Sequence, residues 1–256
     1  MLGIFDSGLG GLTALKALRR LAPDEDIIYL GDTARVPYGT RSRETIVKYA
    51  LECGRFLESK GIDRLLVACG TVSANALGAL ANKFSFPVTG VIRPAVGKAV
   101  RTTVNGKVAV LATSATVRSR AYETELLDYS PDLKVFQKAC PLFVPLVENG
   151  LGPDSEIVRL ACEMYLWDVR DFGADTVILG CTHYPIISDA IKRAVPGAKV
   201  ISSGEEAAVE IAPYLKKPGR GKVTFYVTDG AGDFSSNAAT FLGTDPDGDV
   251  LTAEIG

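Results

Sequence analysis

The sequence contains few of the residues that build metal centres or disulfide frameworks. Its 256 residues include one histidine, His183, and five cysteines, an odd number with no CxxC pair. Because zinc sites need paired ligands at short spacing, we expect no metal site, and without an export signal we expect no disulfides. Lys and Arg total 28 against 30 Asp and Glu, so no basic surplus indicates nucleic acid as a partner.

The sequence also lacks the signals of export or membrane insertion. In the first residues, MLGIFDSGLGG, Asp6 interrupts the apolar run and no basic stretch precedes it, unlike a signal peptide. No apolar run approaches the roughly 18 residues that a spanning helix needs. We therefore expect a cytoplasmic protein with no membrane partner. A composition of 47% hydrophobic and 23% charged residues is ordinary for a globular enzyme of one or two domains.

Short β-rich runs alternate with amphipathic helical stretches along the chain. Residues 12–21 and 43–60, for example, place apolar side chains at helical spacing. Near-continuous apolar strands separated by helices predict an α/β protein with parallel sheets. The predicted strands cover residues 2–5, 26–30, 64–68, 87–92, 107–112, 134–139, 176–180, 199–202 and 223–227.

The two halves of the chain resemble each other. A shift of 112 residues aligns GIDRLLVACGT (61–71) with GADTVILGCTH (173–183) and places Cys69 on Cys181. Repetition of a strand that ends in cysteine predicts two similar parallel-sheet α/β domains, related by pseudo-symmetry, with a cleft between them.

The predicted domains are discontinuous in sequence. Residues 1–96 with 212–256 form the first domain, which carries Cys69, and residues 97–211 form the second, which carries Cys181. A Pro-, Gly- and Lys-rich segment, 213–222, reads as a linker. It precedes a tail with one more strand and a helix, in which DPDGD (245–249) indicates a turn.

Cys69 and Cys181 are expected to face each other across that cleft. Ligands of open α/β sheets bind at the carboxyl ends of the strands, which is where both cysteines lie. Thr71 follows Cys69 by two positions and Thr182 follows Cys181 directly, and each precedes a predicted helix, covering 73–84 and 185–195. A helix N-terminus favours a thiolate, so we expect a lowered thiol pKa at both positions.

Two thiols on opposite sides of one carbon suit inversion of a stereocentre that bears an acidic hydrogen. One thiolate removes the proton from one face, and the opposite thiol returns a proton to the other face. This scheme requires neither a metal ion nor a pyridoxal cofactor.

Polar loops after other strands supply further candidates. Asp6 can orient or deprotonate Cys69, or only cap a helix, and Tyr38 with Gly39 can bind a carboxylate or form an ordinary turn. The hydroxyl-rich ATSATVRS (112–119) suits an anion or a helix cap, and Glu148 can serve Cys181 or lie solvated in its loop.

The chain resembles the cofactor-independent glutamate racemases of bacteria in six motifs. In order across residues 5–185 they are FDSGLGGLT, GDTARVPYG, ACGTVSAN, LATSATVRS, PLVENG and LGCTHYP. The resemblance implies a cofactor-free racemase of glutamate that supplies D-glutamate for peptidoglycan, commonly as a homodimer. It also implies that Cys69 and Cys181 are the acid/base thiols and that Asp6, His183 and Glu148 assist them.

The resemblance also implies that Ser7, Tyr38, Gly39, Thr71 and Thr182 bind the amino acid. Further substrate-binding candidates in the same motifs are Asp6, Pro37, Gly70, Thr113, Thr116 and His183. The chain departs from the family at Gly70, where asparagine is usual. A glycine removes a carboxamide that would contact the substrate, which bears on the preference for glutamate.

Three alternative functions remain open. The first is a racemase of another acidic amino acid, such as aspartate. The second is a hydrolase or transferase that uses Cys181 as nucleophile beside His183, with no role for Cys69. The third is a two-lobed binding protein without catalysis.

Overall fold

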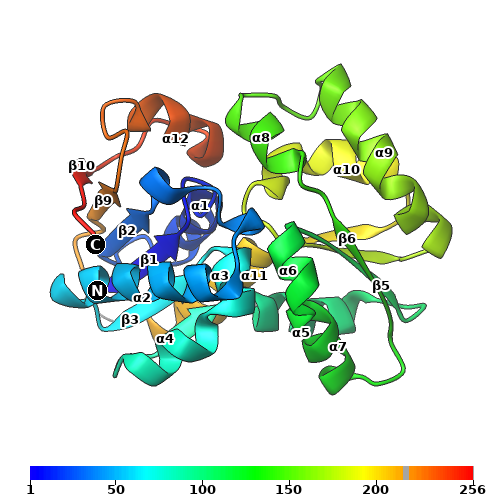
Figure 1. Ribbon diagram of the computed structural model, residues 1–256, viewed down its shortest axis with the longest axis horizontal. Helices are drawn as coiled ribbons and strands as arrows, with labels where there is room; N and C mark the ends of the chain where they lie inside the picture. Colours follow the sequence, from blue (N-terminus) through cyan, green and yellow to red (C-terminus); the bar gives the residue numbers. More distant parts are fainter. Residues whose placement is uncertain (216–218, 256) are drawn as a thin grey trace.

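The computed structural model describes residues 1–215 and 219–255, and it contains two parallel β-sheets. The first sheet consists of β1 (Leu2–Asp6), β2 (Ile27–Gly31), β3 (Arg64–Val67), β4 (Val88–Gly90), β9 (Val223–Val227) and β10 (Asp249–Thr252). The second sheet consists of β5 (Lys107–Ala112), β6 (Lys134–Ala139), β7 (Thr176–Leu179) and β8 (Lys199–Ser202). Figure 1 shows them as two lobes, with both chain termini on the first.

Helices connect and cover the strands. The α-helices are α1 (Leu12–Leu21), α2 (Arg43–Ser59), α3 (Gly70–Asn75), α4 (Leu77–Lys83), α5 (Ile92–Thr102), α6 (Ser114–Ser119), α7 (Ala121–Tyr129), α8 (Phe143–Glu148), α9 (Glu156–Phe172), α10 (Ser188–Ala194), α11 (Ser203–Ile211) and α12 (Phe234–Leu242). Short 3-10 helices are η1 (Thr33–Arg35), η2 (Tyr38–Thr40), η3 (Tyr184–Ile187) and η4 (Ala212–Tyr214). Within the described residues, no helix has the length and apolarity needed to cross a bilayer.

The two sheets share one strand order, which confirms the predicted fold class and its pseudo-symmetry. The first four strands of the chain are arranged β2-β1-β3-β4, and the next four are arranged β6-β5-β7-β8. Strands β3 and β7, which precede the two cysteines, are therefore equivalent. Every strand pairing in both sheets is parallel.

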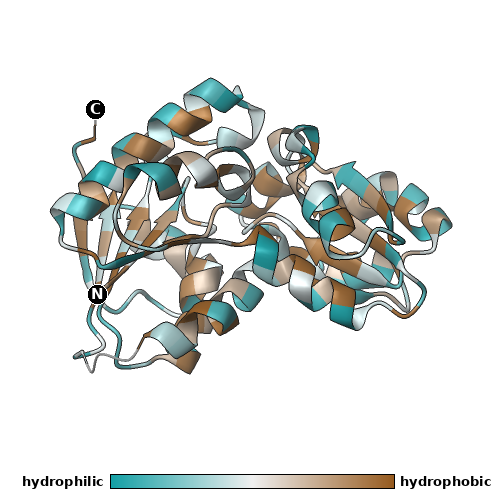
Figure 2. Ribbon diagram, turned by 90° about the horizontal axis from the view of Figure 1, so that it is seen from below, coloured by the Kyte–Doolittle hydropathy of each residue, from teal (hydrophilic) through white to brown (hydrophobic). Residues whose placement is uncertain are grey.

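Both faces of the first sheet are covered by helices because its strands carry apolar side chains on both faces. Leu2 and Ile4 belong to a buried cluster with residues of α1, α11 and α12. Phe5, on the opposite face, belongs to a cluster with residues of α2 and α4. Figure 2 shows the resulting brown strands between helices that turn teal positions outward. This layering leaves the ends of the strands for a site, and ligands of open α/β sheets bind at the carboxyl ends.

The tail returns to the first sheet. Strand β9 pairs with β2, with Val223 opposite Ile27, and β10 extends the edge beyond β9. The sequence did not predict β10; its first residue lies in the segment assigned to a turn. Residues 216–218 of the predicted linker lie outside the described residues.

We propose the same division into domains as the sequence indicates, residues 1–96 with 212–256 and residues 97–211. Supporting it, each proposed domain contains one complete sheet. The boundary falls within α5, whose buried residues Ala95 and Ala99 pack with Val108 of the second sheet.

Candidate active site between the two lobes

A cavity of about 390 Å³ lies between the lobes, where the strands of both sheets end. Its lining residues follow β1, β2 and β3 in one lobe and β5, β6 and β7 in the other. They are Ser7, Val36, Pro37, Tyr38, Gly39, Thr40, Cys69, Gly70, Thr71, Thr113, Ser114, Pro141, Val144, Pro145, Glu148, Cys181, Thr182 and His183. Both predicted catalytic cysteines therefore face one cavity of a size that suits a small ligand.

The segments that carry the two cysteines touch each other through glycine. A Cβ atom built on Gly70 would lie 2.1 Å from the carbonyl oxygen of Gly180 and 3.9 Å from the Cα atom of Cys181. Gly70 follows Cys69, and Gly180 precedes Cys181. Only a residue without a side chain allows this approach, so Gly70 has a packing role that the sequence does not reveal.

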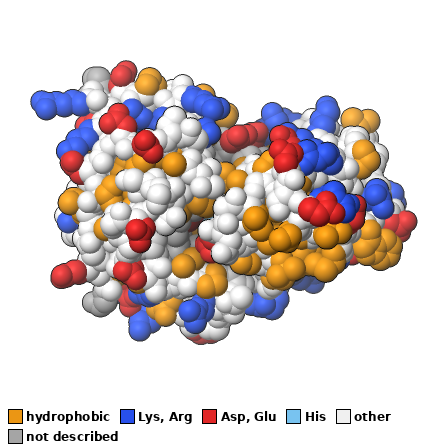
Figure 3. Space-filling model, turned by 90° about the horizontal axis from the view of Figure 1, so that it is seen from above, with side chains coloured by type: hydrophobic (Ala, Val, Ile, Leu, Met, Phe, Trp, Pro, Cys, Tyr) orange, Lys and Arg blue, Asp and Glu red, His pale blue; other side chains and the backbone are white. Residues whose placement is uncertain are grey.

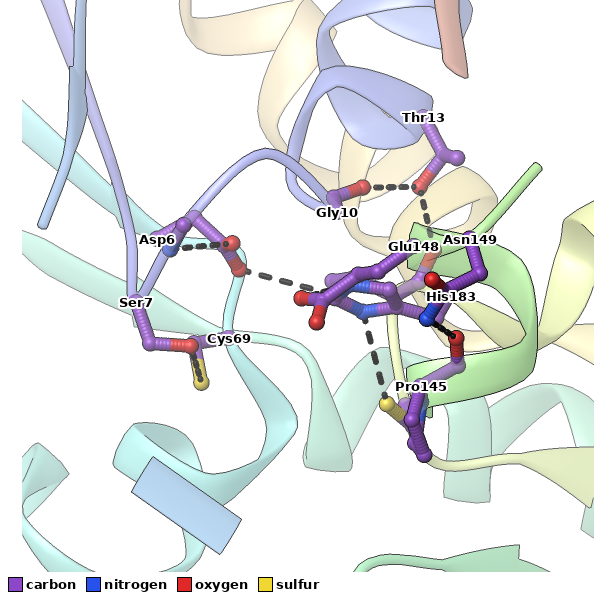
Figure 4. Close-up of polar contacts among 12 residues, drawn as sticks. Asp6, Ser7, Gly10, Thr13, Cys69, Pro145, Glu148, Asn149 and His183 are labelled. Carbon is purple, nitrogen blue, oxygen red and sulfur yellow. Dashed lines mark hydrogen bonds and ion pairs between the residues drawn. The ribbon is translucent and has the colours of Figure 1, made fainter. Parts of the chain in front are cut away.

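Cys69 lies directly before α3, and its side chain is almost fully buried. Its Sγ donates a hydrogen bond to Ser7 Oγ at 3.3 Å (Figure 4). Burial, and next the nearby Asp6 carboxylate, raise the pKa of Cys69 to about 12, against the smaller lowering effect of hydrogen bonds to Ser7 and the Val72 amide. The predicted lowering of the Cys69 pKa at this helix N-terminus is therefore wrong, because desolvation outweighs the helix dipole.

Cys181 has a different set of neighbours. His183 Nδ1 lies 3.9 Å from Cys181 Sγ, and His183 Nε2 lies 3.1 Å from Glu148 Oε1. Glu148 thus reaches Cys181 through the imidazole rather than directly. No α-helix begins at Cys181, because η3 intervenes before α10 starts at Ser188. The helix dipole expected at this thiol is therefore replaced by an imidazole and a carboxylate.

His183 holds a positive charge beside Cys181 at neutral pH. Burial lowers the pKa of the imidazolium, but hydrogen bonds to Cys181 and Glu148 outweigh burial and raise the pKa of His183 to about 10. The ring can therefore donate one N–H toward the sulfur and the other to the carboxylate. A cation at this distance stabilises a negative charge on Cys181.

The titration of His183 is directly measurable because it is the only histidine. We expect NMR of ¹³C-histidine-labelled protein to show one imidazole that stays protonated to about pH 10. Glu148→Gln removes the carboxylate charge, so we expect the pKa of His183 to fall by about one unit. Glu156→Gln, at an exposed glutamate paired with Arg159, is the matched control and is expected to leave the titration unchanged. A wild-type imidazole that titrates near 6.5 would contradict this geometry.

Asp6 lies behind the cavity wall rather than in it. Its side chain is fully buried, and its carboxylate accepts hydrogen bonds from the Gly8 amide at 3.0 Å and from Thr182 Oγ1 at 3.5 Å. Burial raises the pKa of Asp6, whereas the charge of His183 lowers it. The sequence offered Asp6 as a group that orients or deprotonates Cys69; in the structure Cys69 instead donates its hydrogen bond to Ser7. The Asp6 carboxylate acts on the cysteine through its electrostatic field.

Two other predicted binding residues are placed differently from the expectation. The Tyr38 hydroxyl donates to the Asp32 carboxylate, so it is not free to bind a ligand, although Tyr38 lines the cavity. Thr116 is fully buried and does not line the cavity; its Oγ1 lies 3.0 Å from Thr113 Oγ1. Thr113 in turn meets Thr71 Oγ1 at 2.9 Å, which links the hydroxyls of the two lobes.

Some lining residues were missed by sequence reasoning. Ser114 and Thr40 bring further hydroxyls, and Ser114 stands beside Thr113 in a segment already recognised as hydroxyl-rich. The apolar lining residues Val36, Pro141, Val144 and Pro145 carry no chemical signal in a sequence. Among the described residues, no group of three or more His, Cys, Asp or Glu side chains is arranged to hold a metal ion.

Comparison with known proteins relates the chain to a family of racemases. Residues 13–211 match the model of the Asp/Glu/Hydantoin racemase family. The chain is 48% identical over 249 residues to a glutamate racemase of Persephonella marina, covering 95% of this chain and 94% of that one. It is 45% identical over 254 residues to a glutamate racemase of Aquifex aeolicus, covering 99% and 98% of the two chains.

Among solved structures, the glutamate racemase of Francisella tularensis in complex with D-glutamate is similar throughout its length. It superimposes with a TM-score of 0.90 at 36% identity, covering 99% of this chain and 97% of that one. The family match extends over well more than half of the chain, and the relatives exceed 40% identity along nearly all of it. The chain therefore belongs to the Asp/Glu/Hydantoin racemase family.

Proposed function

We propose that the protein interconverts L- and D-glutamate without a cofactor, using Cys69 and Cys181 as the two acid/base groups. The observation that carries the proposal is the lining of one cavity by two cysteines from equivalent strands of opposed lobes, on segments that touch at Gly70 and Gly180. A single base would return a proton to the face it came from, whereas two thiols serve both faces of one carbon.

Each turnover moves two protons and breaks no other bond. In one direction the Cys181 thiolate, stabilised by the His183 imidazolium, takes the α-proton, and the electron pair remains on the α-carbon. The Cys69 thiol then gives its proton to the opposite face and is left as a thiolate. In the other direction the two cysteines exchange roles. Glu148 keeps the imidazole charged, so we assign it a supporting role on the Cys181 side.

The two directions begin from unequal thiols. Because the pKa of Cys69 is about 12, this cysteine is protonated at neutral pH and already suited to be the acid. For Cys69 to act as the base, its thiolate needs support, which the Ser7 hydroxyl can give by reversing its hydrogen bond. The substrate ammonium group adds a positive charge beside the sulfur. Asp6, buried behind this wall, opposes the thiolate and orients Ser7 through the turn at Gly8.

The hydroxyl and backbone groups around the cavity are proposed to hold the substrate carboxylates and ammonium group. They come from Ser7, Pro37, Gly39, Gly70, Thr71, Thr113 and Thr182, with Ser114 added by the structure. Tyr38 contributes through its main chain, because its hydroxyl is engaged elsewhere. His183 contributes at the amino acid end, and Thr116 supports Thr113 from behind.

The decisive experiment is a chiral assay with purified protein. We expect L-glutamate to be converted to a racemic mixture and L-aspartate to react far more slowly. In D₂O the inverted glutamate should carry deuterium at the α-carbon, because its new hydrogen comes from a solvent-exchanged thiol. Faster inversion of aspartate would identify the alternative racemase, and inversion without label would eliminate proton transfer by thiols.

In the cell, the product would supply D-glutamate for peptidoglycan in the cytoplasm, and we propose a homodimer as the working form. A partner surface is available on α9, where Ile157, Leu160, Met164 and Trp167 are all more than half exposed. Figure 3 shows apolar side chains gathered on the lobe that carries this helix. Sedimentation of the wild-type protein at micromolar concentration tests the dimer.

A further inference from the structure

A buried carboxylate outside the cavity holds the loop of residues 33–40, in which residues 36–40 form one wall of the cavity. Asp32 follows β2 and is fully buried. A buried carboxylate is costly unless hydrogen bonds satisfy it, so a protein keeps one where its partners need to be fixed. The three side-chain partners of Asp32 show what is fixed, because they come from two separate parts of the chain.

The first two partners lie in the loop itself. Arg35 Nε donates to Asp32 Oδ2 at 2.7 Å, and the Tyr38 hydroxyl donates to the same oxygen. Arg35 also contacts Glu52 and stacks over the Tyr49 ring at 4.2 Å, which fastens the loop to α2. The Tyr38 hydroxyl is therefore held by this carboxylate.

The third partner comes from the tail. Thr228 Oγ1 donates to Asp32 Oδ1 at 2.9 Å and accepts a hydrogen bond from the Ala34 amide at 2.8 Å. Asp229 and Thr33 exchange two more hydrogen bonds, of 2.6 and 2.9 Å. The end of β9 thus holds the start of the loop, almost 200 residues away in sequence.

The far end of the loop forms the cavity wall. Residues 36–40 all line the cavity, and a Cβ atom on Gly39 would lie 2.9 Å from the Cβ atom of Thr113 in the other lobe. Since Tyr38 is anchored at Asp32 while its neighbours face the ligand space, a shift of this side chain moves the wall. Asp32 also reaches the catalytic side, because its amide donates to the Asp6 carbonyl at 3.1 Å.

We propose that Asp32 is a positioning residue for substrate binding, which acts through Tyr38 and Arg35 to fix residues 36–40 against the substrate. The inference rests on the proposed racemisation of glutamate and adds the group that shapes its binding wall. Asp32 touches neither thiol, so its loss should weaken binding more than it slows proton transfer.

Steady-state kinetics of Asp32→Asn test whether Asp32 affects substrate binding more than proton transfer. The amide keeps the shape of the carboxylate but places an NH₂ group against donors. We expect KM for glutamate to rise at least about tenfold while kcat changes less than about threefold, because misplaced binding groups lose uniform binding rather than transition-state contacts. Asp247→Asn, at an exposed aspartate of the tail, is the matched control and should leave both constants unchanged.

A second pair of variants keeps the test valid if Asp32→Asn does not fold. Thr228→Ser retains the hydroxyl that bridges Asp32 and Ala34, whereas Thr228→Val removes it at nearly constant volume. We expect the serine variant to match the wild type and the valine variant to raise KM. A fall in kcat with KM unchanged, or a loss of thermal stability alone, would overturn the positioning role.

Hydrogen exchange gives a readout that does not depend on the reaction. In Asp32→Asn, and in Thr228→Val, we expect faster amide exchange in residues 33–40 and unchanged exchange in α2 and β2. Unchanged exchange in residues 33–40 would refute the proposal. If the wild type fails to racemise glutamate, the proposed function is wrong, and the exchange data alone decide whether Asp32 fixes the loop.

Discussion

Replacing either Cys69 or Cys181 with alanine is expected to reduce racemisation of glutamate by at least about a thousandfold, because each thiol serves one face of the α-carbon. The loss should appear in kcat in both directions, since either direction needs one cysteine as base and the other as acid. In D₂O, each single variant retains one thiol. It should still exchange the α-hydrogen of one enantiomer slowly, without inversion.

Cys162→Ala is the matched control for these two variants. Its thiol is also buried, in α9, but does not line the cavity, so activity should remain near that of the wild type. If Cys69→Ala kept full activity while Cys181→Ala lost it, the protein would instead use Cys181 as a lone nucleophile. Tight binding of glutamate without turnover in the wild type would point to a binding protein.

Replacing Gly70 with alanine is expected to lower kcat/KM by about a hundredfold, a loss typical of reacting groups displaced by about 1 Å. The new Cβ atom would lie 2.1 Å from the Gly180 carbonyl oxygen, and a backbone atom cannot rotate away as a flexible side chain can. The segment of Cys69 or that of Cys181 must therefore move. Gly70→Asn, which introduces the residue usual in the family, should be at least as damaging here.

Gly78→Ala provides the comparison. Gly78 lies in α4, and apart from its chain neighbours and the backbone of its own helix no described atom lies within 4 Å of the Cβ that alanine would add. This change should keep full activity and stabilise the fold by about 0.5–1 kcal/mol, as alanine does in a helix. Full activity of Gly70→Ala would show that the lobes tolerate a wider separation than this structure has.

The sequence predicts all but one of the described strands, and its signal is clearest for the inner strands β1, β2, β3, β5 and β7, which are buried and apolar on both faces. The exception is β10, whose residues are mostly exposed and follow an aspartate-rich turn, so no apolar pattern marks it. The helix after Cys181 begins later than predicted because Pro185 lies in a 3-10 turn before α10. Repetition of the cysteine strand is a long-range signal, and it correctly gave the relation between the lobes.

The site was predictable as a set of motifs but not as a set of contacts. A sequence cannot show that the Tyr38 hydroxyl turns toward Asp32, or that Thr116 supports Thr113 from behind the wall. Nor can it show how deeply Cys69 is buried, and that depth reverses the expected direction of its pKa shift. These properties depend on the packing of side chains from several elements, which local patterns do not encode.

The unequal surroundings of the two sulfurs have a consequence for steady-state rates. Mirror-image amino acids have equal free energies in water, so the equilibrium constant of the reaction is one. The ratio of kcat to KM must then be the same for both enantiomers, however different the groups that flank each sulfur. A serine beside one sulfur and an imidazolium beside the other can therefore give the two enantiomers different values of kcat only if their KM values differ by the same factor.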